Sequence, residues 1–151
     1  MSAREDFVQA VESLLGMPVL WGQKGPDAYD CSGLVTVCLR KVGGPDLRHT
    51  HNAQNLYGAT RALVVGELPL GGDLVFYGHG PDSIEHVAVY TADGGVVSAD
   101  GATSRVKDIR SALANESARI RRHNSVHYRR DTPFITLHRN TLVDALDKVT
   151  R

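Results

Sequence analysis

The sequence has few cysteines, the residues that form disulfides and bind structural zinc. It contains two cysteines, Cys31 and Cys38, among 151 residues, too few for a disulfide framework. Neither belongs to a CxxC pair or a cysteine–histidine cluster, so the sequence does not indicate structural zinc. If both lie on one helix, they are about 10 Å apart along its axis, too far for a disulfide. We therefore expect two free thiols and no bound metal.

Three further absences narrow the function classes. No apolar run approaches the roughly 20 residues that span a bilayer, so we expect no membrane partner. The segment Met1–Asp6 lacks the basic-then-apolar pattern of a secretory signal. The protein is therefore expected to stay inside the cell, or to be delivered by phage, lysis or a secretion system. Gly43-Gly44 and Gly71-Gly72 lack the flanking residues of a phosphate-binding loop, and we expect no cofactor.

Charge is balanced in total but unevenly distributed. Residues 1–100 carry six Lys/Arg against twelve Asp/Glu, and residues 101–151 carry eleven against five. The basic C-terminal third contains five clustered arginines: Arg119, Arg121, Arg122, Arg129 and Arg130. Such a cluster is either a surface for a polyanion or a solvated face. We favour the solvated face, and no nucleic-acid partner, because no nucleic-acid-binding motif accompanies the charge.

Hydrophobic periodicity predicts helices first and strands later. A capping box, Ser2-x-x-Glu5, precedes a helical stripe that ends near Gly16. A second helix is expected from Asp30 as N-cap to Val42. The other expected elements are strands at 74–77, 86–90, 96–99 and 133–137, a short helix within 108–122 and a terminal helix near 142–149. This order predicts an α+β fold with N-terminal helices packed on an antiparallel sheet, as a single domain over 1–151.

The segment Asp30-Cys31-Ser32-Gly33 carries the clearest chemistry. A thiol at a helix N-terminus meets the positive end of the helix dipole and free backbone N–H groups, which stabilise the nucleophilic thiolate. The same N–H groups can hold a tetrahedral oxyanion, and Gly33 keeps the first turn uncrowded, so that a substrate can come close. The alternative is that Cys31 is an apolar core residue. We assign that role to Cys38, two turns further along the same stripe.

Five segments together resemble the NlpC/P60 cysteine peptidases. They are Pro18-Val19-Leu20-Trp21-Gly22, Asp30-Cys31-Ser32-Gly33-Leu34-Val35, Ala53-Gln54, Leu70-Gly71-Gly72-Asp73-Leu74-Val75-Phe76 and His86-Val87-Ala88-Val89-Tyr90. The likeness covers about residues 5–101, and the last third, 102–151, follows it only loosely. It implies a papain-like core that hydrolyses peptide bonds in peptidoglycan stem peptides, often next to D-glutamate and a diamino acid.

The resemblance also implies roles for individual residues. Cys31 corresponds to the nucleophile and His86 to its base. Asp30 and Ser32 match residues that in similar enzymes hold the free amine of the stem peptide, and Trp21 belongs with them as a substrate-binding residue. From the sequence alone, Asp30 can equally cap the helix, bind an ammonium, or do both.

Strand alternation separates His86 from the six other histidines. His86 opens a strand in which Val87 and Val89 should be buried on the opposite face, so His86, Ala88 and Tyr90 share one side of the sheet. His49, His51 and His79 fall in expected loops, and His123, His127 and His138 fall in the basic third.

Two positions depart from the family pattern. The third polar residue of relatives corresponds to Ser98, whose hydroxyl carries no charge, and Asp100 is a second candidate on the same face. A two-residue turn at Asp93-Gly94 would turn both away from His86, whereas an odd-length connection or a bulge would turn them toward it. Val19 replaces a tyrosine that many relatives have, and its candidate substitutes are Tyr29 and Tyr57.

Three functions are consistent with these observations. The first is a cysteine endopeptidase of the cell wall, in a phage lysis or tail assembly or as a secreted effector. The second is a weak or inactive domain that binds wall peptides or assembles in a larger particle, suggested by Val19 and Ser98. The third is an amidase that uses the same Cys–His site.

Overall fold

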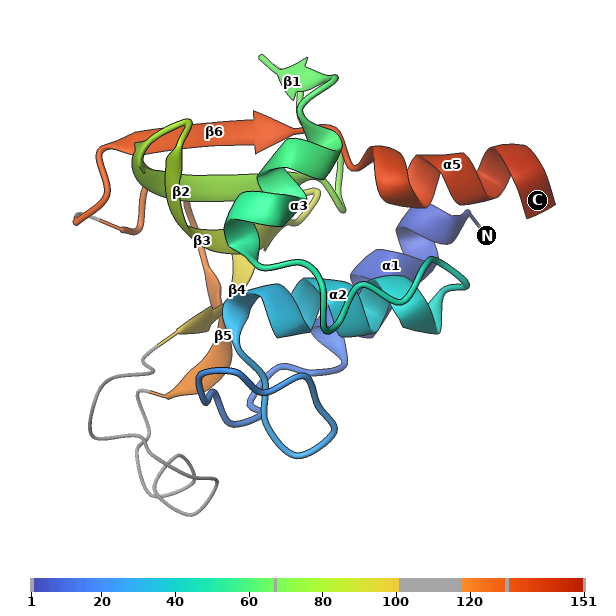
Figure 1. The fold of residues 1–151 in the computed structure, drawn as a ribbon, viewed down its shortest axis with the longest axis horizontal. Coiled ribbons are helices and arrows are strands. Elements are labelled where there is room, and N and C mark those ends of the chain that lie inside the picture. Colours follow the sequence, from blue (N-terminus) through green and yellow to red (C-terminus); the bar gives the residue numbers. More distant parts are fainter. Residues whose placement is uncertain (1, 67, 101–117, 130, 151) are drawn as a thin grey trace.

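The computed structural model describes residues 2–66, 68–100, 118–129 and 131–150. In chain order its elements are α1 (Ala3–Glu12), α2 (Cys31–Lys41), α3 (Ala53–Thr60), β1 (Val64–Val65), β2 (Leu74–Gly80), β3 (Ser83–Tyr90), β4 (Val96–Asp100), β5 (Arg119–His123), β6 (Phe134–His138) and α5 (Thr141–Thr150). The strands form one sheet in the order β1-β6-β2-β3-β4-β5, with every neighbouring pair antiparallel. The expected α+β class, with helices on an antiparallel sheet, is confirmed (Figure 1).

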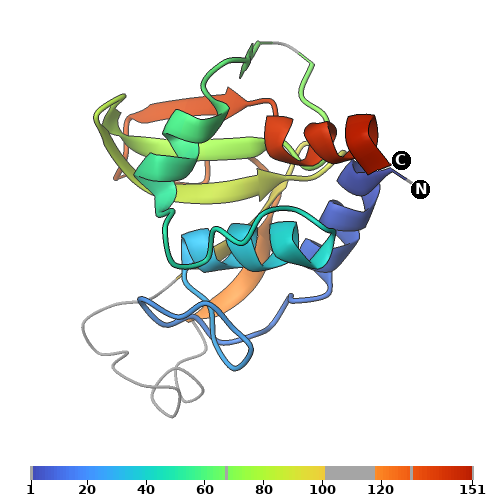
Figure 2. The same cartoon turned by 45° about the vertical axis from the view of Figure 1, so that its right-hand side comes forward.

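The main core lies between the helices and one face of the sheet. Phe7, Leu34 and Leu56, from α1, α2 and α3, are fully buried against it. The same cluster takes Phe76 and Val87 from β2 and β3. Figure 2 shows α2 and α3 lying across the sheet. Because a helix buries one stripe and a strand buries alternate residues, the periodicity of the sequence predicts this packing.

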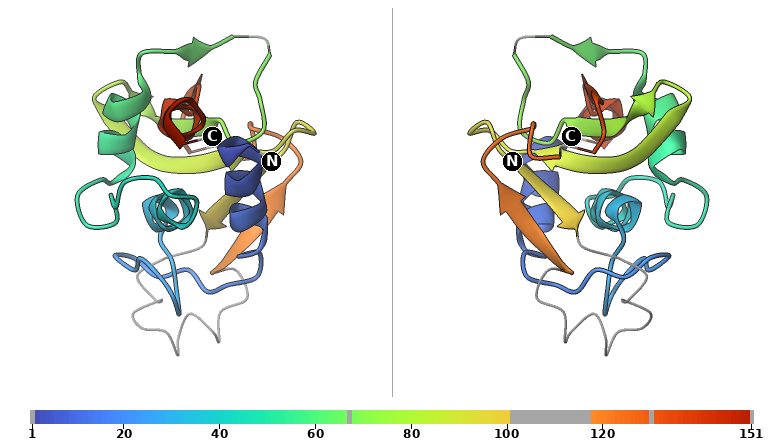
Figure 3. Two further views of the ribbon diagram at one scale, coloured as in Figure 1. Left: turned by 90° about the vertical axis from the view of Figure 1, so that its right-hand side faces the viewer. Right: turned by 90° about the vertical axis from the view of Figure 1, so that its left-hand side faces the viewer.

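A buried ion cluster joins the first helix to the last. The Asp73 carboxylate is fully buried and pairs with Arg4 at 2.8 Å and with Arg139 at 3.0 Å. Arg4 also pairs with Asp144 of α5 at 2.8 Å. These contacts explain the Gly-Gly-Asp segment before β2, and they place α1 beside α5 near the two ends of the chain (Figure 3).

The sheet has a second, smaller apolar cluster on its other face. Val75, Tyr77, Ala88 and Val96 are buried there. Val126 and Tyr128, which follow β5, cover part of this cluster. The segment that follows β5 therefore packs over the sheet face that carries His86. In the described part of the chain, no helix has the length and apolar content to cross a membrane.

Two local expectations differ from the structure. The helix expected over 108–122 is wrong at its C-terminal end, where Arg119–His123 form β5; residues 101–117 lie outside the described residues. Buried Ile120 between partly exposed Arg119 and Arg121 follows strand alternation rather than a helical stripe. The strands expected at 74–77 and 86–90 are longer than predicted, since β2 continues to Gly80 and β3 begins at Ser83, with a register shift at Gly78. A Cβ there would lie 2.0 Å from the Ser83 carbonyl oxygen, so the close approach of the strands requires glycine.

Candidate active site

Cys31 is the first residue of α2. Asp30 is the N-cap, and its carboxylate accepts a hydrogen bond of 2.5 Å from the Gly33 backbone N–H. Cys31 as a whole residue is partly exposed, and its thiol is not paired with Cys38, which is fully buried. The expected free thiols and the core position of Cys38 are confirmed. The first turn also leaves the Cys31 and Ser32 N–H groups without helical carbonyl partners, so they can receive a developing negative charge.

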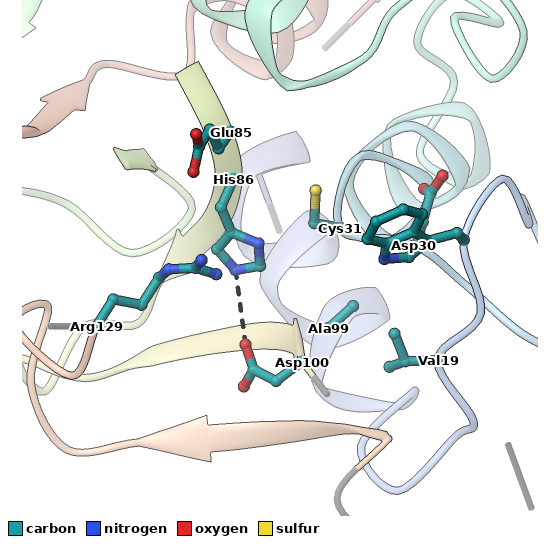
Figure 4. Close-up of a pocket in the computed structure, with 9 residues that line it drawn as sticks. Val19, Asp30, Cys31, Glu85, His86, Ala99, Asp100 and Arg129 are labelled. Carbon is teal, nitrogen blue, oxygen red and sulfur yellow. Dashed lines mark ion pairs between the residues drawn. The ribbon is translucent and has the colours of Figure 1, made fainter. Parts of the chain in front are cut away.

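His86 lies where two strands separate. The β3–β4 ladder consists of Val89↔Val97 and Tyr90↔Val96. Beyond these pairs the strands diverge, and His86 and Asp100 line the space between them together with Cys31 (Figure 4). The imidazole is 5% exposed. Its Nδ1 is on the side of the ring that faces Cys31 (Figure 4).

The connection between β3 and β4 determines whether Ser98 and Asp100 lie on the same sheet face as His86. It runs from Thr91 to Gly95, an odd number of residues, so Ser98 and Asp100 share the face of His86. Ser98 Oγ lies 2.6 Å from His86 Nε2, and Asp100 Oδ1 lies 3.6 Å from the same nitrogen. Both candidates for the third polar residue therefore contact the imidazole, Ser98 directly and Asp100 behind it.

The hydrogen-bond network determines which imidazole nitrogen carries the proton. Tyr128 Oη lies 3.0 Å from His86 Nε2. The Ser98 and Tyr128 hydroxyls donate to Asp100 Oδ1 at 2.7 and 3.0 Å. The two hydroxyls also lie 2.8 Å from each other. When both donate their single proton to the Asp100 carboxylate, each can only accept from Nε2. In this pattern His86 is protonated at Nε2, and its Nδ1 presents a lone pair toward Cys31, as a general base requires.

Sequence reasoning missed the contribution of the last third to this network. Tyr128 is one missed residue. His123 is another, since its Nε2 lies 2.5 Å from Asp100 Oδ2 and its ring stacks on Tyr128 at 3.7 Å between centroids. Arg129 lines the cavity beside His86 and lies over the Tyr77 ring at 5.9 Å. No local signal in the sequence pointed to His123, because its position beside Asp100 depends on the pairing of β5 with β4.

Burial favours the neutral form of both the Cys31 thiol and the His86 imidazole. Burial and, to a smaller extent, the nearby Arg129 together lower the pKa of His86 to about 3, against the opposing effect of Asp100. Burial also raises the pKa of the Cys31 thiol, although the Val87 N–H acts in the opposite direction. The expected thiolate-stabilising effect of the helix N-terminus is thus outweighed by desolvation. The resting pair is a thiol beside a neutral imidazole.

The lowered pKa of His86 predicts a pH-dependent stability. Between pH 6.5 and about 3, the unfolded chain binds a proton on His86 that the folded protein does not. The free energy of unfolding should therefore fall with falling pH in this window, by up to about 1.4 kcal/mol per pH unit from His86 alone. The pKa values of His138 and Asp100 are also lowered and act in the same direction.

Urea unfolding of wild type and His86→Gln from pH 7 to 4.5 isolates the histidine contribution. The variant should lose stability less steeply than wild type below pH 6.5. Parallel curves for the two proteins would show that His86 is protonated in the folded state and would contradict the buried neutral imidazole.

Two adjoining cavities form a groove across Cys31. One, of about 470 Å³, contains His86, Asp100 and Arg129. The other, of about 340 Å³, contains Ser32 and the start of α3. Both are lined by Trp21, Asp30, Cys31 and Glu85. Trp21 is 75% exposed, so its ring is available to a ligand in the groove.

The motif Ala53-Gln54 serves the hairpin that carries His86. The Gln54 side chain donates to the Pro81 carbonyl and accepts from the Ile84 N–H, both at 2.8 Å. It thereby ties α3 to the start of β3 and fixes the strand beside Cys31.

Neither Tyr29 nor Tyr57 supplies the tyrosine hydroxyl that many relatives have at the position of Val19. Val19 lines the larger cavity and is 1% exposed. The candidate substitutes lie elsewhere: Tyr29 is in the core, and Tyr57 packs on Phe76 and His138. Tyr128 is the hydroxyl-bearing aromatic residue that reaches His86.

Comparison with known proteins identifies relatives of this arrangement. The NlpC/P60 family model matches residues 16–130. The probable endopeptidase YafL of Escherichia coli K12 is 37% identical over 93 residues, which cover 60% of this chain and 36% of YafL. A gamma-D-glutamyl-L-lysine dipeptidyl-peptidase of Bacillus cereus is 30% identical over 109 residues, 71% of this chain and 32% of that protein. The chain thus spans about a third of the length of these two relatives.

Solved structures with the same fold include catalytic and non-catalytic proteins. The peptidoglycan hydrolase RipB of Mycobacterium tuberculosis is 25% identical with a TM-score of 0.62, covering 91% of this chain and 64% of that one. RipD of the same organism, described as non-catalytic and adapted to peptidoglycan binding, is 18% identical with a TM-score of 0.65, covering 93% and 98%. The likeness to RipD concerns the fold alone. With the family match extending from the loop before Cys31 to the residues that complete the His86 network, the chain belongs to the NlpC/P60 family.

Proposed function

We propose that this protein is a cysteine peptidase that hydrolyses peptide bonds in peptidoglycan stem peptides. One observation carries the proposal: a thiol at the start of α2 faces the unprotonated Nδ1 of an imidazole held by Ser98, Tyr128 and Asp100. The names of the relatives, probable endopeptidase and gamma-D-glutamyl-L-lysine dipeptidyl-peptidase, support the substrate class.

The proposed reaction proceeds through a thioester. As the Cys31 sulfur attacks the peptide carbonyl, its proton moves to His86 Nδ1. The N–H groups of the first turn of α2 hold the oxyanion. The imidazolium then returns the proton to the departing amine. Water, deprotonated by the same imidazole, hydrolyses the thioester and frees the thiol.

Asp100 acts in this scheme as a positioning residue. Its carboxylate, 3.6 Å from Nε2, is attracted to the imidazolium that forms during attack and so offsets part of the cost of charging a buried ring. It also orients the two hydroxyls that fix the tautomer. Ser98 and Tyr128 then transmit this orientation through direct hydrogen bonds.

A second candidate function is binding without hydrolysis. The raised pKa of Cys31 and the absence of a hydroxyl at Val19 favour it, because both weaken the nucleophile or its support. An amidase that cuts between sugar and peptide is a third use of the same pair. Delivery by a phage, a lysis system or a secreted effector remains a prediction.

Product analysis tests the proposed function. Purified peptidoglycan of several chemotypes is digested with wild type, and the soluble fragments are identified by mass spectrometry. A peptidase releases new amino-acid amines with the sugar–peptide link intact, whereas an amidase frees the lactyl carboxyl group. No new fragment from any wall type, with folded protein, would favour the binding function.

A further inference from the structure

The carboxylate beside the nucleophile is already occupied by groups of the protein itself. Asp30 Oδ1 accepts from Lys24 Nζ at 2.8 Å, from the Gly33 N–H at 2.5 Å and from Ser32 Oγ at 3.2 Å. Asp30 Oδ2 accepts from Lys24 Nζ at 2.8 Å and from the Gly22 N–H at 3.2 Å. A carboxylate offers about four acceptor positions. Asp30 therefore has no acceptor position left for an ammonium group of a ligand.

The Lys24 ammonium is correspondingly well bound. It also lies 2.9 Å from Ser32 Oγ, so its three protons have three acceptors: both Asp30 oxygens and the Ser32 hydroxyl. The Lys24 and Asp30 side chains are each 17% exposed. A half-exposed surface pair would contribute little, but this pair is largely shielded and is supported by backbone donors.

Gly33 makes room for this arrangement. A Cβ at Gly33 would lie 2.5 Å from the Gln23 carbonyl oxygen and 3.2 Å from Lys24 Cδ. The space above the first turn, expected to admit a substrate, is thus filled by the loop that carries Lys24. The glycine allows the protein to place its own ammonium against the N-cap of α2.

This ammonium lies next to one arm of the groove. Asp30 and Ser32 line the cavity on the α3 side of Cys31. Glu85, the other carboxylate of this cavity, lies across Cys31 from Asp30 (Figure 4). It is half exposed and lies 3.4 Å from His79, a weak site for a second cation. A ligand ammonium entering here would approach Lys24, and the buried carboxylate among the described residues of this cavity is already filled.

We infer that Lys24 is a specificity-determining residue that excludes a free terminal amine from this arm of the groove. The inference rests on the proposed function and names its substrate class: stem peptides whose terminal amine is acylated, as it is where the peptide is still joined to the glycan. Loss of the Lys24 charge should free Asp30 and Ser32 to receive a ligand ammonium.

Binding to an inactive background tests this inference separately from catalysis. A γ-D-glutamyl-lysine stem peptide is prepared once with a free N-terminal amine and once N-acetylated. Calorimetry measures both dissociation constants on Cys31→Ala, and on the same protein carrying Lys24→Met, Lys24→Arg or, as a matched control, Lys41→Met. Lys41 is an exposed lysine at the far end of α2, so its replacement removes the same charge outside the groove.

Cys31→Ala should bind the acetylated peptide at least about tenfold more tightly than the peptide with a free amine. Adding Lys24→Met to Cys31→Ala should tighten binding of the free-amine peptide by about tenfold or more. Lys24→Arg and Lys41→Met should retain the original preference. If Cys31→Ala prefers the free-amine peptide, or binds neither peptide, the inference is overturned. This comparison of the two peptides on Cys31→Ala does not depend on any Lys24 variant. An unchanged preference in folded Lys24→Met also overturns it. If wild type fails to cut a peptide that Cys31→Ala binds with the expected preference, the proposed function fails and the inference stands.

Discussion

Replacing His86 with glutamine should lower kcat/KM on purified peptidoglycan by at least about a hundredfold, the size expected for loss of a general base. Glutamine can still hydrogen-bond Ser98 and Tyr128, so the network behind the ring can persist. It has no lone pair of suitable basicity to take the proton of Cys31. The loss should therefore appear in kcat, with little change in binding.

The wild-type pH profile gives an independent measure of the same base. With its pKa lowered to about 3, His86 should remain a competent base well below pH 6.5, so activity should persist at pH 5. The exposed histidine His49 provides the matched control, since His49→Gln should leave the rate and the profile unchanged. An activity of His86→Gln within a few-fold of wild type would contradict the assignment of the base.

Replacing Asp100 with asparagine should lower kcat by about tenfold or more, because the tautomer of the base depends on it. An asparagine amide can donate to the Ser98 and Tyr128 hydroxyls. These hydroxyls would then be free to donate to Nε2, which would place the proton on Nδ1 and remove the lone pair that faces Cys31. The substitution also removes the charge that favours the imidazolium.

Ser98→Ala distinguishes the two candidates for the third polar residue. It removes one acceptor of the Nε2 proton but leaves Tyr128 and Asp100, so its effect on kcat should be smaller than that of Asp100→Asn. Steady-state rates of the two variants, compared at matched thermal stability, decide the matter. A larger loss in Ser98→Ala would assign the orienting role to the serine hydroxyl and contradict the one given to the carboxylate.

The sequence predicts those parts of the site that depend on local periodicity. Asp30 as N-cap, Cys31 at the start of a helix, and the valines of β3 buried opposite His86 all follow from 3.6- and 2-residue repeats within one element. Whether Ser98 and Asp100 face His86 depends on the length of the connection between β3 and β4. The sequence does not predict that length, because Asp93-Gly94 is itself a typical two-residue hairpin turn.

The parts that escaped prediction depend on contacts between distant segments. Tyr128 and His123 reach Asp100 across the sheet, and their role follows from the pairing of β5 with β4, which no local pattern specifies. The Lys24 contact depends on a loop folded over the first turn of α2. The sequence feature that pointed to this loop was Gly33. We interpreted this glycine as making space for a substrate, but the space is taken by the Gln23 carbonyl and the Lys24 side chain.

The measurement that tests the central claim most directly is the release of new amines from purified peptidoglycan by wild type and by Cys31→Ala. Cys31 is partly exposed, so alanine should be accommodated with little loss of stability, which thermal unfolding verifies. We predict that wild type releases amines and that Cys31→Ala is slower by at least about a hundredfold. Equal release by both folded proteins, or none by wild type from several wall types, would contradict a peptidase that uses this cysteine.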